Sequence, residues 1–258
     1  MNMSTLCRMG AAVLIMGLVG CAPARMSLKP SFWKETQHKV GVATLAAPKL
    51  AAYRAGSEGL LDMAINSAMA GSLEAHLQSL DASKFAAVAD QYVEKLNERG
   101  LNARRLSKTV NPLTMSPFTS EAPGEFAEKD LRPLAEQEGI DMLILLSLQQ
   151  CGTTRKYYGF IPLGPPEALC VSKGELIDLR TNQIAWRAYP EISEAILPVE
   201  GEWAQAPDYR NVTLAIDKAM TRAQVFLLED FFGPSQRATS RPPRVSDSTF
   251  AILRRAGR

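Results

Sequence analysis

The stretch Ile140-Asp141-Met142-Leu143-Ile144-Leu145-Leu146-Ser147-Leu148 decides the fold of this chain. Its apolar residues do not alternate with polar ones, as they would in a strand with one wet face. A run of this kind is typical of a strand that is covered on both sides. We therefore expect residues 140–148 to form a central strand of a sheet.

Helices and further strands are predicted on both sides of this segment. The expected strands cover 39–45, 101–106, 169–179 and 183–189, and the expected helices cover 60–80, 83–99, 125–138 and 209–232. Gly100, Gly139 and Gly233 each follow an expected helix, where a left-handed cap is common. Loops are expected at 51–59 and 110–124. This order predicts an α/β (α+β) fold, a single three-layer-like domain with a mixed sheet of about five strands flanked by about four helices.

The first twenty-one residues indicate where the protein works. Arg8 precedes the apolar run 9–19, which is followed by Gly20 and Cys21. The run is about half of the ~20 residues that span a bilayer, which favours a cleaved signal peptide. Leu18-Val19-Gly20-Cys21 resembles the lipobox of bacterial lipoproteins, whose cysteine is acylated and starts the mature chain. The alternative is a soluble secreted protein that is cleaved at another small residue.

The lipobox resemblance also implies a location. The residue after the acylated cysteine is Ala22 and not an aspartate, which in lipoproteins points to the outer membrane. We expect a lipid-anchored protein that faces the periplasm, with exposure at the cell surface as the alternative. The expected division of the chain is a signal peptide (1–20), a lipid-to-domain spacer (21–37), an α/β domain (38–232) and a basic, disordered tail (233–258).

Charge argues against nucleic-acid binding, because the formal net charge is only +2. The tail is the exception, with six arginines against the single acid Asp247. A solvated end is the simplest interpretation. Attraction to anionic lipid head groups or cell-wall polymer, and binding of a partner, are the alternatives.

The cysteines predict one disulfide. Cys7 leaves with the signal peptide and Cys21 takes lipid, so Cys151 and Cys170 are the remaining thiols. In an oxidising periplasm two such cysteines favour a disulfide. A metal pair or a catalytic thiol is the alternative, but the chain has no Cys-x-x-Cys and both histidines are distant in sequence.

No catalytic signature is present in the sequence. The chain has no Gly-x-Ser-x-Gly, Gly-x-x-x-x-Gly-Lys or His-Glu-x-x-His motif. His76 falls between core positions of the helix expected at 60–80, where a structural role is usual. We expect a non-enzymatic protein with no metal and no cofactor besides covalent lipid on Cys21. Folding could still bring two carboxylates together, so a cell-wall-active enzyme or a peptidoglycan- or glycan-binding module is the alternative.

The segment 152–169 is expected to be a loop that the disulfide closes. Rigid aromatic and proline residues beside basic ones are typical of contact surfaces. The candidate partner-contact residues are Arg155, Lys156, Tyr157, Tyr158, Phe160, Ile161 and Leu163. Alternatively, the apolar members of this set cap the edge of the core.

The stretch Gly174-Glu175-Leu176-Ile177-Asp178-Leu179-Arg180-Thr181-Asn182-Gln183-Ile184-Ala185-Trp186 resembles a hairpin of the curli-secretion channel lipoprotein and its relatives. These relatives include a penicillin-binding-protein activator lipoprotein, the amino-terminal domain of the Tol-system periplasmic protein, and a group of uncharacterised surface lipoproteins. Val40-Gly41-Val42-Ala43 and Gly59-Leu60-Leu61-Asp62 fit the last group best. The resemblance covers about 38–232 and implies the fold and an envelope setting.

One departure from the curli channel argues against a pore. Membrane hairpins need apolar-faced spans of roughly nine to eleven residues. Prolines interrupt both candidate segments, 152–169 and 188–200. We therefore expect an accessory, assembly or regulatory component that contacts an envelope protein, either as a monomer or as a homo-oligomer.

Acylation of Cys21 is directly testable. Mass analysis of the purified mature protein should show a chain that starts at Cys21 and carries fatty acyl groups, because a lipobox cysteine is acylated and becomes the first residue of the mature chain. An unmodified amino terminus, or a leader retained inside the cell, would contradict the prediction.

Overall fold

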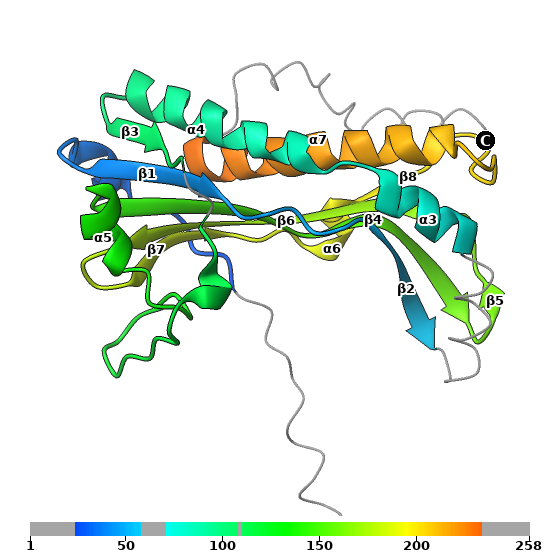
Figure 1. The fold of residues 1–258 in the computed structure, drawn as a ribbon, viewed down its shortest axis with the longest axis horizontal. Coiled ribbons are helices and arrows are strands. Elements are labelled where there is room, and N and C mark those ends of the chain that lie inside the picture. Colours follow the sequence, from blue (N-terminus) through cyan, green and yellow to red (C-terminus); the bar gives the residue numbers. More distant parts are fainter. Residues whose placement is uncertain (1–23, 58–70, 108–109, 234–258) are drawn as a thin grey trace, which may run out of the picture.

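A mixed β-sheet is the framework of the structure, a computed structural model that describes residues 24–57, 71–107 and 110–233 (Figure 1). Its strands are β1 (Lys39–Thr44), β2 (Ala51–Ser57), β3 (Asn102–Arg105), β4 (Met142–Tyr158), β5 (Ile161–Pro162), β6 (Glu167–Asp178), β7 (Gln183–Ala188) and β8 (Ile196–Pro198). The α-helices are α3 (Gly71–Ser79), α4 (Ala87–Glu98), α5 (Pro133–Glu138), α6 (Ile192–Ala195) and α7 (Arg210–Phe232). Short 3₁₀ helices are η1 (Pro30–Lys34), η2 (Ser83–Ala86) and η3 (Pro112–Thr114). The predicted signal peptide, Cys21 and the tail from 234 on lie outside the described residues.

The sheet is parallel in one half and antiparallel in the other. Its order is β3-β1-β4-β6-β7, with β1 parallel to both β3 and β4, while β4, β6 and β7 run antiparallel in turn. β2 lies beside the outer half of β4, also parallel. The single-domain α+β class is therefore as predicted. The described sheet has eight strands instead of about five, because β2, β5 and β8 are added.

Both faces of the first half of β4 are buried, as the run 140–148 predicts. Ile144 and Leu146 face the layer of α4 and α7, whereas Leu143 and Leu145 pack with α5 on the opposite face. The larger core lies under α4 and α7. Tyr92 of α4 is fully buried there and donates a hydrogen bond to the carbonyl of Leu227 at 2.7 Å. Burial raises the pKa of the Tyr92 phenol well above its ordinary value.

An aromatic cluster fastens the amino-terminal segment to the domain. Phe32 packs edge-on against Phe231 at 5.9 Å, and Trp186 packs against the same ring at 4.8 Å. Upstream, the backbone of Met26 exchanges hydrogen bonds with Arg187 at the edge of β7. The stretch 25–37, which belongs to the predicted spacer 21–37, therefore packs onto the domain.

Two predicted elements differ in the structure, and a third is described only in part. Residues 51–57 form β2 and not a loop, because they pair with β4 in the register Ala51 to Gly152. The helix expected at 83–99 starts as the 3₁₀ helix η2 and becomes α-helical at Ala87. The helix expected at 60–80 is described only as α3, since 58–70 lie outside the described residues.

The helix expected at 125–138 is helical only from Pro133. The side chain of Asn182 explains this difference. It accepts a hydrogen bond from the backbone of Leu131 and donates to the carbonyls of Ala127 and Lys129, at 2.9 to 3.1 Å. Backbone groups that a helix would need are thus used by a turn residue far away in sequence.

Gly174 provides a test of the packing between β6 and β7. A Cβ atom there would lie 2.4 Å from Cη2 of Trp186, which is fully buried. Gly174→Ala should lower the free energy of unfolding by about 1–3 kcal/mol, because the ring has no room to move. Urea unfolding measures this loss.

Gly71→Ala is the matched control. Nothing lies within 4 Å of its added Cβ in helix α3, so stability should stay the same or rise by up to about 1 kcal/mol. Equal effects of the two substitutions would contradict the packing shown by the structure.

Candidate functional site

The segment 152–169 is a hairpin and not the predicted loop. β4 continues to Tyr158, the chain turns at Gly159 and Phe160, and β5 and β6 return antiparallel to β4. The β-branched and aromatic residues at 153, 154, 157 and 158 favour a strand, and this was the available sequence signal. The strand continues because β2 pairs with it across a glycine, Gly152, whose φ of 142° permits the close approach of Ala51.

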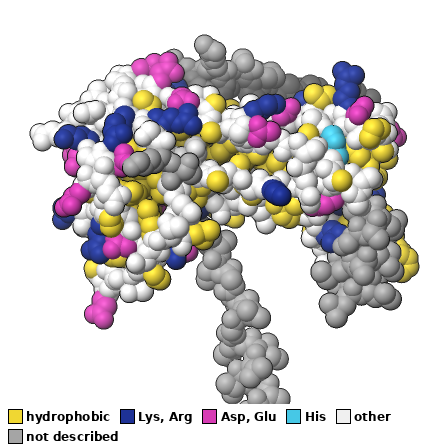
Figure 2. All heavy atoms as spheres, in the orientation of Figure 1, with side chains coloured by type: hydrophobic (Ala, Val, Ile, Leu, Met, Phe, Trp, Pro, Cys, Tyr) yellow, Lys and Arg dark blue, Asp and Glu magenta, His cyan; other side chains and the backbone are white. Residues whose placement is uncertain are grey.

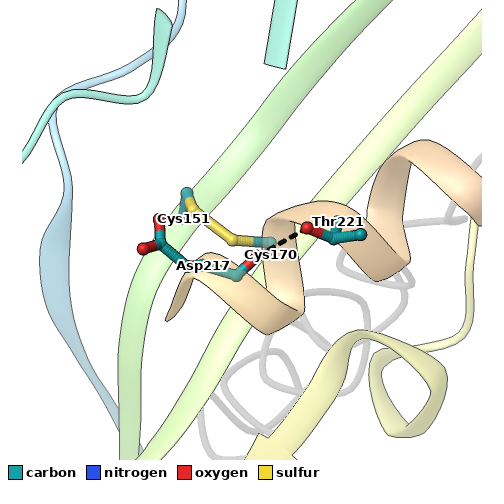
Figure 3. Close-up of a disulfide and its surroundings, with 4 residues drawn as sticks. All are labelled: Cys151, Cys170, Asp217 and Thr221. Atoms are coloured by element: carbon teal, nitrogen blue, oxygen red, sulfur yellow. Dashed lines mark hydrogen bonds between the residues drawn. A yellow bond between two sulfur atoms is a disulfide. The ribbon is translucent and has the colours of Figure 1, made fainter. Parts of the chain in front are cut away.

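The structure contains the predicted disulfide. Cys151 and Cys170 lie directly opposite each other on β4 and β6, with Cα atoms 4.2 Å apart. A register shift between Leu148 and Gln150 changes the alternation of β4, so Cys151 faces the helix layer. Figure 3 shows the bridge beneath α7, near Asp217 and Thr221. The disulfide therefore joins the strands at the point where the hairpin leaves the core.

Strand alternation divides the seven candidate contact residues between two faces. Tyr158 pairs with Ile161, and the backbone nitrogen of Leu163 donates to the carbonyl of Lys156. The side chains of Tyr158, Ile161 and Leu163 are 71%, 52% and 63% exposed. We call Lys156, Tyr158, Ile161 and Leu163 the hairpin face. The alternative that the apolar members of the set cap the core does not fit these three exposed side chains, whereas Tyr157 is buried, with 8% exposed.

The opposite side of the hairpin lines a cavity of about 230 Å³. Arg155, Tyr157 and Phe160 enter it from the hairpin, and Tyr157 is only 8% exposed. Trp203 and Tyr209 close it from the segment before α7, and Ser72 closes it from α3. We call this the Arg155 cavity. Sequence reasoning missed Trp203 and Tyr209, because folding alone brings them beside β4.

Arg155 is held inside this cavity by aromatic and backbone contacts. Its guanidinium lies 4.7 Å from the centre of the Trp203 ring and 5.8 Å from that of Tyr157. Its Nε donates to the carbonyl of Gly164 at 2.6 Å. On the α3 side, the hydroxyls of Ser72 and Tyr209 are 2.7 Å apart. The cavity thus combines a cation, aromatic walls and hydroxyl groups.

A second, larger cavity of about 830 Å³ lies at the other end of the sheet. It is bounded by the amino-terminal segment, the start of β4 and the β6–β7 turn, and its lining includes Phe32, Ile140, Asp141 and Arg180. Among the described residues, no group of three His, Cys, Asp or Glu side chains is placed to hold a metal ion. His76 forms a hydrogen bond with Thr213, with 2.8 Å between His76 Nε2 and Thr213 Oγ1.

Comparison with known proteins adds no family assignment. No protein-family model and no curated protein sequence matches the chain. Among solved structures it is similar to a PelC dodecamer from Paraburkholderia phytofirmans, with 14% identity, a TM-score of 0.30, and coverage of 78% of this chain and 95% of that one. Protein XCC0632 from Xanthomonas campestris shows 10% identity, a TM-score of 0.33, and coverage of 80% and 90%. Lipoprotein GNA1162 from Neisseria meningitidis shows 10% identity and a TM-score of 0.22, with coverage of 58% of this chain and 80% of that one.

The class that the structure defines is a single mixed-sheet α+β domain with a projecting disulfide-linked hairpin. No helix in the described part of the chain has the length and apolar character needed to traverse a bilayer.

Reduction tests the contribution of the disulfide. The bridge closes a loop across a sequence separation of 19, which corresponds to about 3 kcal/mol in the chain-entropy account. Urea unfolding with and without dithiothreitol should show this loss, and the double variant C151A/C170A should not respond to reductant. Free thiols at Cys151 and Cys170 in the untreated protein would contradict the pairing.

Proposed function

We propose that this protein is a non-enzymatic lipoprotein of the outer membrane, anchored through Cys21 and facing the periplasm. Its role is that of an accessory, assembly or regulatory component of an envelope complex. The hairpin face is the surface that holds the partner, a protein seated in or on the same membrane. The observation that carries the proposal is the exposed apolar surface of this projecting hairpin.

The composition of the hairpin face supports a protein contact. Three large apolar side chains, those of Tyr158, Ile161 and Leu163, are more than half exposed on adjacent strands. Adjacent exposed apolar groups of this kind mark interaction sites in soluble domains. A tyrosine beside aliphatic residues is also a common anchor of protein interfaces, because its ring buries much area and loses little side-chain entropy.

The position of the hairpin supports a partner at the membrane. The described chain begins at the edge strand β7, where Met26 pairs with Arg187, and in Figure 1 the hairpin tip projects to the side of the sheet away from α4 and α7. Arg25 is held by an ion pair with Asp230. Only three residues separate Arg25 from Cys21, so a lipidated cysteine lies within about 14 Å of Arg25 at full extension. Anchoring would therefore hold the β7 edge of the domain close to the bilayer, within reach of a partner on the same membrane.

Site-specific photo-crosslinking in intact cells tests the proposal. A photoreactive amino acid at position 158, 161 or 163 should give light-dependent adducts with a defined protein, identified by mass spectrometry. The same amino acid at Leu214, which is 49% exposed on α7, is the matched control and should give none. Adducts with lipid alone, or equal protein adducts from position 214, would overturn the proposal.

A triple substitution separates binding from folding. The variant Y158S/I161S/L163S should lose the partner in pull-downs while its melting temperature stays close to that of the wild type, since exposed side chains contribute little to stability. Deletion of 153–168 is unsuitable, because it removes paired residues of β4, β5 and β6. Unchanged capture by the triple variant would count against the hairpin face.

A further inference from the structure

We propose that the Arg155 cavity binds a single sugar ring that bears a carboxylate. Arg155 holds the carboxylate, and the aromatic walls cover the apolar face of the ring. This inference does not depend on the partner proposed for the hairpin face, because the cavity opens on the other side of the hairpin. It adds a ligand site to the protein-contact surface proposed above.

The positive charge of Arg155 indicates that the ligand carries a negative charge. Its contacts among the described residues are the Gly164 carbonyl and the rings of Tyr157 and Trp203, and none of these is a carboxylate. Among these contacts, the hydrogen bond is the one that Nε donates. A guanidinium has further donors on Nη1 and Nη2, in a fork that matches a carboxylate. Because none of these described contacts of Arg155 is a carboxylate, a half-buried guanidinium favours an anionic group in the cavity.

The aromatic side chains and hydroxyls that line the cavity indicate the chemistry of the rest of the ligand. Trp203, Tyr157 and Phe160 supply flat apolar surfaces, and the hydroxyls of Ser72 and Tyr209 supply donors and acceptors at the α3 side. A small inorganic anion would use Arg155 and leave the aromatic walls uncovered. A purely apolar ligand would make no use of the Nη donors of Arg155 or of the remaining hydrogen-bonding capacity of the Ser72 and Tyr209 hydroxyls. A pyranose with a carboxylate satisfies all three features, because its C–H face is apolar and its rim is polar.

The size of the cavity limits the ligand to one ring. Its volume of about 230 Å³ is below the range of roughly 300–1,000 Å³ that is usual for drug-sized ligands. A uronate unit of a polysaccharide and a muramate whose lactyl carboxyl carries no peptide share the required chemistry. The test must therefore include both sources.

Isothermal titration of the purified domain with glucuronate, N-acetylmuramate and N-acetylglucosamine tests the site. Saturable binding of one or both acidic sugars is expected, with affinity that falls as salt rises. The acidic sugar that binds more tightly identifies the source. N-acetylglucosamine lacks the carboxylate and should bind at least tenfold more weakly. Equal binding of the neutral sugar, or no saturation by either acidic sugar at about 10 mM, would overturn the proposal.

Substitutions assign the binding to the cavity. Arg155→Gln should weaken acidic-sugar binding about ten- to a hundredfold, the loss expected for a charge-assisted hydrogen bond. Arg180→Gln, at the β6–β7 turn on the far end of the sheet, is the matched control and should bind normally. Trp203→Leu keeps Arg155 and removes the stacking surface, so it should also weaken binding. Melting curves verify that each variant is folded, and unchanged binding by folded Arg155→Gln and Trp203→Leu would overturn the assignment.

Discussion

The antiparallel pairing of β4 with β6 is the interaction on which the rest of the structure depends. β4 is paired with β6 or β5 along almost all of its seventeen residues. The inner half of this ribbon carries the core on both faces, whereas the outer half leaves the helix layer and presents the hairpin. A change in the pairing register would therefore move the core side chains, the two cysteines and the Arg155 cavity together.

The register shift after Leu148 links the core to the candidate sites. Before the shift, even-numbered residues of β4 face α4 and α7; after it, odd-numbered residues do. Cys151 can therefore meet Cys170 beneath α7, and Arg155 and Tyr157 can face Trp203. The same shift leaves Tyr158 on the exposed side. In Figure 2 hydrophobic side chains (yellow) are visible in patches across the middle of the face in view, between charged side chains.

Elements specified by local pattern could be predicted from the sequence. The apolar run at 140–148, the stripe of α7 and the Thr181-Asn182 turn between β6 and β7 each carry their signal within a few residues. Elements that depend on distant partners could not. β2 consists largely of small residues and is a strand because β4 lies beside it, and residues 127–131 are not helical because Asn182 occupies their backbone groups. The candidate site shows the same limit, since Trp203 reaches Arg155 from about fifty residues away in sequence.

The contacts of Arg25 and Met26 restrict how the domain can move relative to Cys21. The ion pair to Asp230 and the backbone bonds to Arg187 leave almost no slack between the body and Cys21. If Cys21 carries the proposed lipid, the domain would move laterally in the plane of the bilayer and rotate little about other axes. Encounters with neighbours in the same leaflet would then occur at a high effective concentration, and a contact too weak to persist in free solution would suffice.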